Sequence, residues 1–145
     1  MAIRTATAEW DGTFSDGGGS VALGSGAFEG SYSAESRFEE GQGTNPEELL
    51  GAAHAGCFTM ALSLALTDAG TPPEHLDTDA RVSLVKDDER GGFTVNKIEL
   101  RTRGRVPGID QAGFEQAAQA AKDGCPISKA LAVPNISVEA TLEGA

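Results

Sequence analysis

The segment between Asn45 and Gly70 limits the possible folds of this chain more than any other feature. Asn45 before Pro46 forms a helix start, because Asn caps helices and Pro is favoured at the first helical position. Glu48, three residues after the cap, completes a variant of the capping box. Gly70 and the two prolines after it supply the helix stop. The apolar residues of this helix point around its whole circumference: Leu49, Leu50, Ala52, Ala53, Ala55, Cys57, Phe58, Met60, Ala61, Leu62, Leu64, Ala65 and Leu66.

A helix that is apolar on every side has to be covered on every side. The chain has 145 residues, which fits one domain over residues 1–145 and is long enough for a sizeable core. A single small sheet within such a domain covers only part of the helix, so a second copy of the chain is the natural cover for the rest. Small residues from Gly51 to Gly56 would let another backbone approach closely. We therefore expect a homodimer.

The segments on either side of the long helix indicate short strands and two further helices. Before it, Ala6–Trp10, Ser20–Leu23 and Phe28–Ser33 alternate with glycine turns, which is typical of a meander. After it, residues 80–84 and 93–101 form a strand pair whose alternation slips near Asn96 and Lys97, which predicts a bulge.

The last third of the chain completes the predicted fold. Spacing predicts a helix from Asp110 to Gly124, a short helix over residues 125–131 and a last strand over residues 136–142. The order βββ-α-ββ-α-α-β indicates an α+β domain.

Charge narrows the range of partners. Acidic residues outnumber basic ones 22 to 11, which gives a net charge of −11. Nucleic acids and anionic membranes repel such a surface, so we expect neither as a partner. The N-terminal residues lack the apolar core of a signal peptide, and no later stretch approaches the roughly 20 apolar residues of a membrane span. We expect a cytoplasmic protein.

The cysteines, Cys57 and Cys125, are either inert buried thiols, as their number alone favours, or a redox pair. A reducing cytosol argues against a static disulfide. Cys125 precedes Pro126 at a predicted helix start, where amide N–H groups stabilise a thiolate; a small apolar cap is the alternative. Cys57 lies deep inside the long helix, so burial would raise its pKa and it would need a cation to react.

Arg37 is the candidate cation. It follows the third predicted strand and precedes the loop that leads into the Cys57 helix. A surface ion pair with Glu35, Glu39 or Glu40 is the alternative, which the residues alone favour slightly. Most other arginines lie where their charge should face water: Arg81, Arg90, Arg101, Arg103 and Arg105.

His54 lies three positions before Cys57 and so shares its helix face. It could act as a base for the thiol, although a structural histidine is the more frequent case. A metal site built from His54, Cys57, Cys125 and His75 matches no compact zinc spacing, so we expect no metal.

Two segments resemble the OsmC branch of the OsmC/Ohr family of thiol peroxidases: Thr44-Asn-Pro-Glu-Glu-Leu-Leu-Gly-Ala-Ala-His-Ala-Gly-Cys-Phe58 and Cys125-Pro-Ile-Ser-Lys-Ala-Leu131. The resemblance covers essentially the whole chain. It implies an OsmC-like fold in an intertwined dimer. It also implies an antioxidant, stress-response enzyme that reduces organic hydroperoxides without a cofactor.

The resemblance also implies roles for individual residues. Cys57 matches the cysteine that attacks the peroxide and becomes a sulfenic acid, and Cys125 matches the resolving cysteine that forms the Cys57–Cys125 disulfide. Arg37 matches the arginine that holds the thiolate, and Glu47 matches the acid paired with it. An external dithiol, dihydrolipoyl in this family, would regenerate the thiols. A non-catalytic redox sensor or binding module that uses the same cysteine pair is the alternative, and a structural dimer with silent thiols is a second one.

Helix geometry separates two of these residues. Glu47 and Cys57 are ten positions apart, which is about 15 Å along a helix axis. They cannot share one site within one chain. We predict that Arg37 and Glu47 act on Cys57 of the other subunit, in two composite active sites. A preference for organic peroxides would come from apolar neighbours: Phe38, Leu49, Phe58 and Met60.

Overall fold

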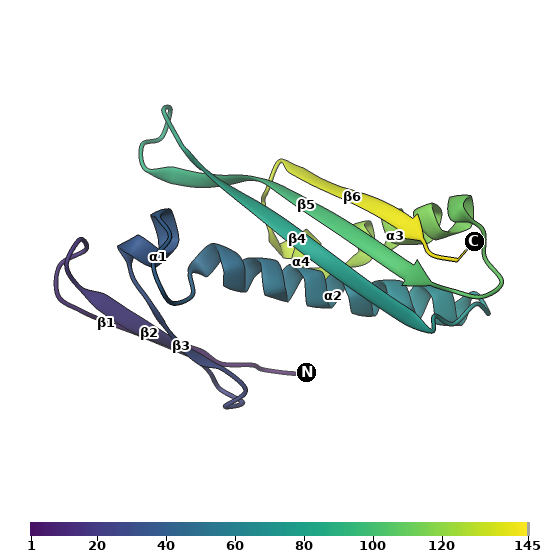
Figure 1. Cartoon of the computed structure of the whole chain (residues 1–145), viewed down its shortest axis with the longest axis horizontal. Coiled ribbons are helices and arrows are strands. Elements are labelled where there is room, and N and C mark those ends of the chain that lie inside the picture. Colours follow the sequence, from purple (N-terminus) through teal and green to yellow (C-terminus); the bar gives the residue numbers. More distant parts are fainter. Residues whose placement is uncertain (145) are drawn as a thin grey trace. The chain divides into compact units, whose positions relative to one another are not determined.

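The computed structural model describes residues 1–144, and the chain divides into two compact units, Met1–Leu49 and Leu50–Ala145. The first unit contains β1 (Ala6–Asp11), β2 (Gly18–Leu23) and β3 (Glu29–Tyr32), paired antiparallel in chain order (Figure 1). The predicted meander is confirmed.

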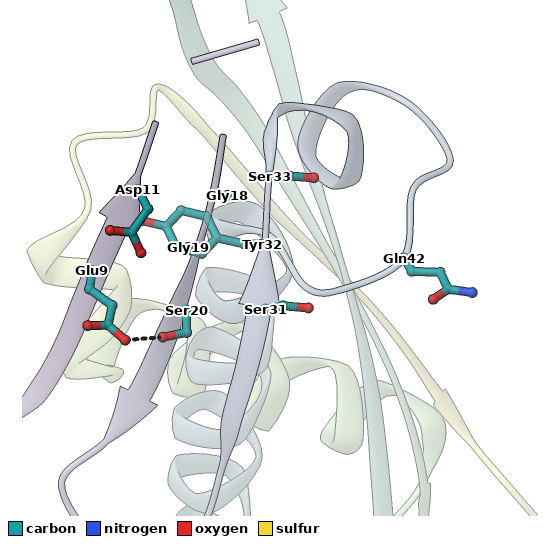
Figure 2. Close-up of a pocket in the computed structure, with 9 residues that line it drawn as sticks. All are labelled: Glu9, Asp11, Gly18, Gly19, Ser20, Ser31, Tyr32, Ser33 and Gln42. Atoms are coloured by element: carbon teal, nitrogen blue, oxygen red, sulfur yellow. Dashed lines mark hydrogen bonds between the residues drawn. The ribbon is translucent and has the colours of Figure 1, made fainter. Parts of the chain in front are cut away.

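Close packing of two aromatic rings stabilises this first sheet. Trp10 and Tyr32 meet edge to face with ring centroids 5.3 Å apart. Figure 2 shows the Tyr32 ring lying across β2, and a Cβ atom at Gly19 would come within 2.9 Å of its Cε1 atom. Glycine at this position therefore permits the ring to cross the strand. The sheet also carries an open polar pocket of about 430 Å³, in which Ser20 donates a hydrogen bond of 3.2 Å to Glu9 (Figure 2).

A short helix, α1 (Ala34–Phe38), follows β3 and was not predicted. A reciprocal capping box starts it: the Ser36 amide donates to the Ser33 hydroxyl at 3.1 Å, and the Ser33 amide donates to the Ser36 hydroxyl at 2.8 Å. Serine replaces the usual Glu or Gln at the second box position. A helix of five residues is also too short to show a hydrophobic periodicity, so α1 could not be predicted from the sequence.

The long helix α2 (Pro46–Asp68) begins and ends as predicted. The Asn45 Oδ1 atom accepts a hydrogen bond of 2.7 Å from the Glu48 amide. Gly70 has a φ of 86°, and the Thr71 amide donates to the Leu66 carbonyl at 2.9 Å, which is the Schellman arrangement.

The second unit contains a three-stranded sheet in the order β4-β5-β6 (Figure 1). Its strands and helices are β4 (His75–Lys86), β5 (Phe93–Arg105), α3 (Gln111–Gly124), α4 (Pro126–Ala130) and β6 (Asn135–Leu142). β4 is antiparallel to β5, and β6 is parallel to it. The predicted order is confirmed, with α1 added and two small sheets in place of one.

The predicted bulge in the β4-β5 pair is also confirmed. Ser83 pairs with Lys97 and Leu84 with Val95, so the register shifts at Asn96. One face of the sheet packs on the helices, because Ile98 and Leu100 join the core formed by α2 and α3 (Figure 1). The arginines of β5 lie at the alternate positions and are exposed, as predicted: Arg101, Arg103 and Arg105.

The sides of α2 differ in burial although both are apolar. Phe58, Leu62 and Leu66 are buried in the core of the second unit, whereas Met60 and Leu64 are 76% and 63% exposed. α2 also has the length of a membrane span and a mean hydropathy of 1.6 over its most apolar window. The expectation that no stretch approaches the length and apolarity of a membrane span was therefore wrong, because the many alanines of α2 add to its apolar character. Core helices of globular proteins reach the same values.

Candidate active site

The two cysteines lie together in the second unit. Cys57 is on α2, Cys125 joins α3 to α4, and their Sγ atoms are 2.8 Å apart as free thiols. Cys125 is fully buried, whereas Cys57 is partly accessible. A disulfide has an S–S distance of about 2.05 Å, so a small side-chain movement is enough to join them. A reagent in solution can therefore reach the Cys57 thiol, whereas the Cys125 thiol is covered by the protein.

The surroundings of the two thiols shift their pKa values in opposite directions. Burial raises the pKa of Cys57, as predicted, and the hydrogen bond with Cys125 raises it further, against a smaller opposing contribution from the Ile127 amide. Burial also acts to raise the pKa of Cys125. Hydrogen bonds from Cys57, from the amide and hydroxyl of Ser128 and from the Ile127 amide outweigh burial and lower it.

These shifts decide where the negative charge of the pair rests. Thiols in direct contact ionise as a pair, and either one can donate the shared proton. Within the second unit the charge is better stabilised on Cys125. An attack by Cys57 requires the opposite state, with the Cys125 S–H donating to a Cys57 thiolate. A cation near Cys57 would favour that state.

Arg37 and Glu47 form an ion pair in the first unit. Arg37 is in the last turn of α1 and Glu47 in the first turn of α2. The Nη2 atom lies 2.7 Å from Oε1, and Nε lies 3.1 Å from the same oxygen and 3.2 Å from Oε2. The structure thus contains this fork-shaped pair and not the alternative pairs with Glu35, Glu39 or Glu40.

Two hydrogen bonds hold the elements that carry this pair. The Ser36 hydroxyl donates to the Thr44 carbonyl at 2.7 Å, and the Asn45 amide group donates to the Ser36 carbonyl at 3.2 Å. They tie α1 to the start of α2. The Glu47 side chain is 12% exposed and that of Arg37 is 35% exposed, so the guanidinium is the reachable partner.

An apolar pocket of about 330 Å³ adjoins Arg37 in the first unit. Aromatic side chains from β1, the following turn and β3 line it, namely Trp10, Phe14 and Tyr32. Phe38 lies beside the guanidinium, with its ring centroid 5.3 Å from Cζ of Arg37. The prediction that Phe58 is one of the apolar neighbours that favour organic peroxides was wrong, because Phe58 is fully buried in the core of the second unit.

His54 is fully buried and hydrogen-bonded to a residue that the sequence analysis did not single out. Its Nε2 atom lies 2.7 Å from the Ser128 Oγ atom of α4. Its Nδ1 atom has no hydrogen-bond partner within residues 1–144. Burial lowers the pKa of His54, which keeps the ring neutral at neutral pH. Ser128 could have been noticed as the residue three positions after Cys125, where a helix side chain reaches back to the cap.

The two residue pairs thus come from different units: Arg37 with Glu47 from the first, Cys57 with Cys125 from the second. No cluster of three or more metal-ligating side chains occurs in the described part of the chain, residues 1–144.

Comparison with known proteins gives the family. The OsmC-like protein family matches residues 39–141. The chain belongs to this family. The OsmC-like chain is 50% identical to Peroxiredoxin OsmC of Escherichia coli over 125 residues, which is 86% of each chain. It is 37% identical to an organic hydroperoxide resistance protein of Xanthomonas axonopodis pv. citri, over 70% of this chain and 68% of that one.

Solved structures give the same fold. The crystal structure of an organic hydroperoxide resistance protein OsmC from Legionella pneumophila matches with a TM-score of 0.73 and 26% identity, and the match covers 98% of each chain. The predicted OsmC-like α+β fold is therefore confirmed.

Proposed function

We propose that this OsmC-like protein is a thiol-dependent peroxidase that reduces organic hydroperoxides in the cytoplasm. The observation that carries the proposal is the pair of free thiols 2.8 Å apart, one accessible and one buried. Relatives named peroxiredoxin and organic hydroperoxide resistance protein support a peroxidase-type role.

The proposed cycle has three steps. The Cys57 thiolate attacks the terminal peroxide oxygen, so an S–O bond forms, the O–O bond breaks, and the alkoxide takes up a proton and leaves as an alcohol. Cys125 then attacks the Cys57 sulfenic acid, so the S–S bond forms, the S–O bond breaks and water leaves. A dithiol, dihydrolipoyl in our proposal, reduces the disulfide through a mixed disulfide.

Arg37 of a partner subunit supplies the cation in this proposal. The raised pKa of Cys57 calls for one, and helix geometry separates Glu47 from the Cys57 of its own chain by about 15 Å. Glu47 engages Nε and Nη2 of Arg37, so it orients the guanidinium while leaving its exposed side to meet the thiolate and the peroxide.

The apolar pocket beside Arg37 supports a preference for organic peroxides. Its aromatic lining would remove an alkyl or aryl group from water, whereas hydrogen peroxide has no such group. We expect a higher kcat/KM for cumene hydroperoxide than for hydrogen peroxide. Equal values would contradict this preference.

Steady-state turnover tests the activity itself. Peroxide consumption should continue over many equivalents with dihydrolipoamide, should be slower with thioredoxin or glutathione, and should stop in Cys57→Ser. Consumption of a single equivalent with every reductant would instead identify a redox sensor. If neither thiol is oxidised, the protein is instead the structural dimer with silent thiols.

A further inference from the structure

Ser128 lies between the buried thiol and a buried histidine. Cys125 caps α4 and Ser128 is the third residue of that helix, so the serine side chain reaches back toward the cap. Its hydroxyl is among the hydrogen-bonding groups that lower the pKa of the Cys125 thiol. The same Oγ atom is 2.7 Å from His54 Nε2 on α2. The backbone at Cys125 already links α3 to α4, so the side-chain contacts of Ser128 are not required for that link.

The unpartnered nitrogen of His54 indicates which way these hydrogen bonds run. A neutral imidazole carries one N–H and one lone pair, and buried N–H groups without a partner are rarer than acceptors without one. Because Nδ1 is the atom without a partner within residues 1–144, we place the proton on Nε2. Nε2–H then donates to Ser128 Oγ. The serine proton is left to donate to the Cys125 sulfur.

We propose that Ser128 and His54 are positioning residues for Cys125, in which Nε2–H donates to the hydroxyl and the hydroxyl donates to the sulfur as it attacks the Cys57 sulfenic acid. This inference rests on the proposed function and assigns the two residues to its second step. His54 is thus a neutral donor to the resolving thiol through serine, and not a base for Cys57.

The second step explains why such donors are useful. Cys125 gives up its proton and carries negative charge while the S–S bond forms; the departing hydroxide from Cys57 takes up that proton and leaves as water. Cys125 is fully buried, where charge without hydrogen bonds is costly. The lowered pKa of Cys125, to which the Ser128 hydroxyl contributes, agrees with this role. A short-lived sulfenic acid would also escape overoxidation.

Single-turnover kinetics separates the two steps. After rapid mixing with one equivalent of cumene hydroperoxide, peroxide loss reports the attack by Cys57, and the decay of dimedone-reactive sulfenic acid reports disulfide formation. We expect Ser128→Ala to slow disulfide formation at least tenfold and to lengthen the sulfenic acid lifetime by the same factor. Ser128→Thr keeps the hydroxyl and should restore most of the rate. Ser137→Ala, which changes an exposed serine of β6, is the matched control.

The histidine provides an independent pair of variants. His54→Gln keeps an N–H donor at a similar reach, and His54→Leu removes it, so only the leucine variant should accumulate sulfenic acid. This pair applies the same test if Ser128→Ala fails to fold. Disulfide formation at the wild-type rate in Ser128→Ala, or equal slowing in Ser128→Ala and Ser128→Thr, would overturn the inference. A wild-type protein that consumes no peroxide would instead overturn the proposed function, and the inference with it.

Discussion

At the scale of single residues, the reactivity of Cys57 depends on which atom of the thiol pair holds the negative charge. Burial raises the pKa of Cys57, and a guanidinium beside the sulfur would lower it again. We expect Arg37→Gln to slow alkylation of Cys57 by iodoacetamide at pH 7 about tenfold or more, and to move the pH profile of alkylation to higher pH. Glu47→Gln should act in the same direction but less.

A matched loss of charge checks that this effect is local. Arg90→Gln removes the same charge from the exposed β4-β5 turn and should leave alkylation of Cys57 unchanged. Using Cys125→Ser as the background confines the label to Cys57. Equal rates in the parent and in Arg37→Gln would rule out Arg37 as the cation.

The sequence predicted some of these residues better than others. Glu47, Cys57 and Cys125 stand in the two long segments that resemble a known family, so a match by position was enough to propose them. Arg37 lies before the first segment and was proposed from its place ahead of the loop that leads into the Cys57 helix. Ser128 was missed, because its contact with His54 joins residues 74 positions apart and no local pattern encodes it.

At the scale of elements, one glycine fits α3 against the sheet. A Cβ atom at Gly104 of β5 would lie 2.6 Å from Cζ of Phe114 and 2.9 Å from Cδ2 of Leu76. Phe114 is fully buried, in the core of the second unit. Gly104→Ala should therefore lower the free energy of unfolding by about 1–3 kcal/mol through overpacking.

Urea denaturation followed by circular dichroism measures this change. Gly124→Ala is the control, because no atom lies within 4 Å of a Cβ built there. It should change the free energy of unfolding by no more than about 0.5 kcal/mol. An unchanged midpoint for Gly104→Ala would show that α3 does not pack as closely on β5 as the structure indicates.

Element ends were predictable where a cap or a turn residue marks them, as at Asn45, Gly70 and Asp110. Pairing was not, since alternation along residues 136–142 predicts a strand with one buried face but not its partner. The parallel pairing of β6 with β5 follows from the α3-α4 connection, which returns the chain to the same end of the sheet.

At the scale of the whole molecule, one side of α2 is apolar and exposed. Met60 and Leu64 lie one helical turn apart there, and Gly56 one turn before them is also exposed. A second copy of the chain is the occupant that we propose, because the same copy would bring Arg37 and Glu47 to a Cys57 that cannot meet its own Glu47.

Subunit mixing tests this arrangement directly. The inactive variant Cys57→Ser and the impaired variant Glu47→Gln are co-expressed with different tags, and the heterodimer that carries both tags is isolated. If Glu47 serves the partner's thiol, one of the two sites combines an intact Cys57 with an intact Glu47, so the heterodimer should show about half the wild-type peroxidase activity. If Glu47 serves the thiol of its own chain, both sites stay defective and the activity does not rise above that of the Glu47→Gln variant. Failure to recover any species with both tags would contradict the dimer itself.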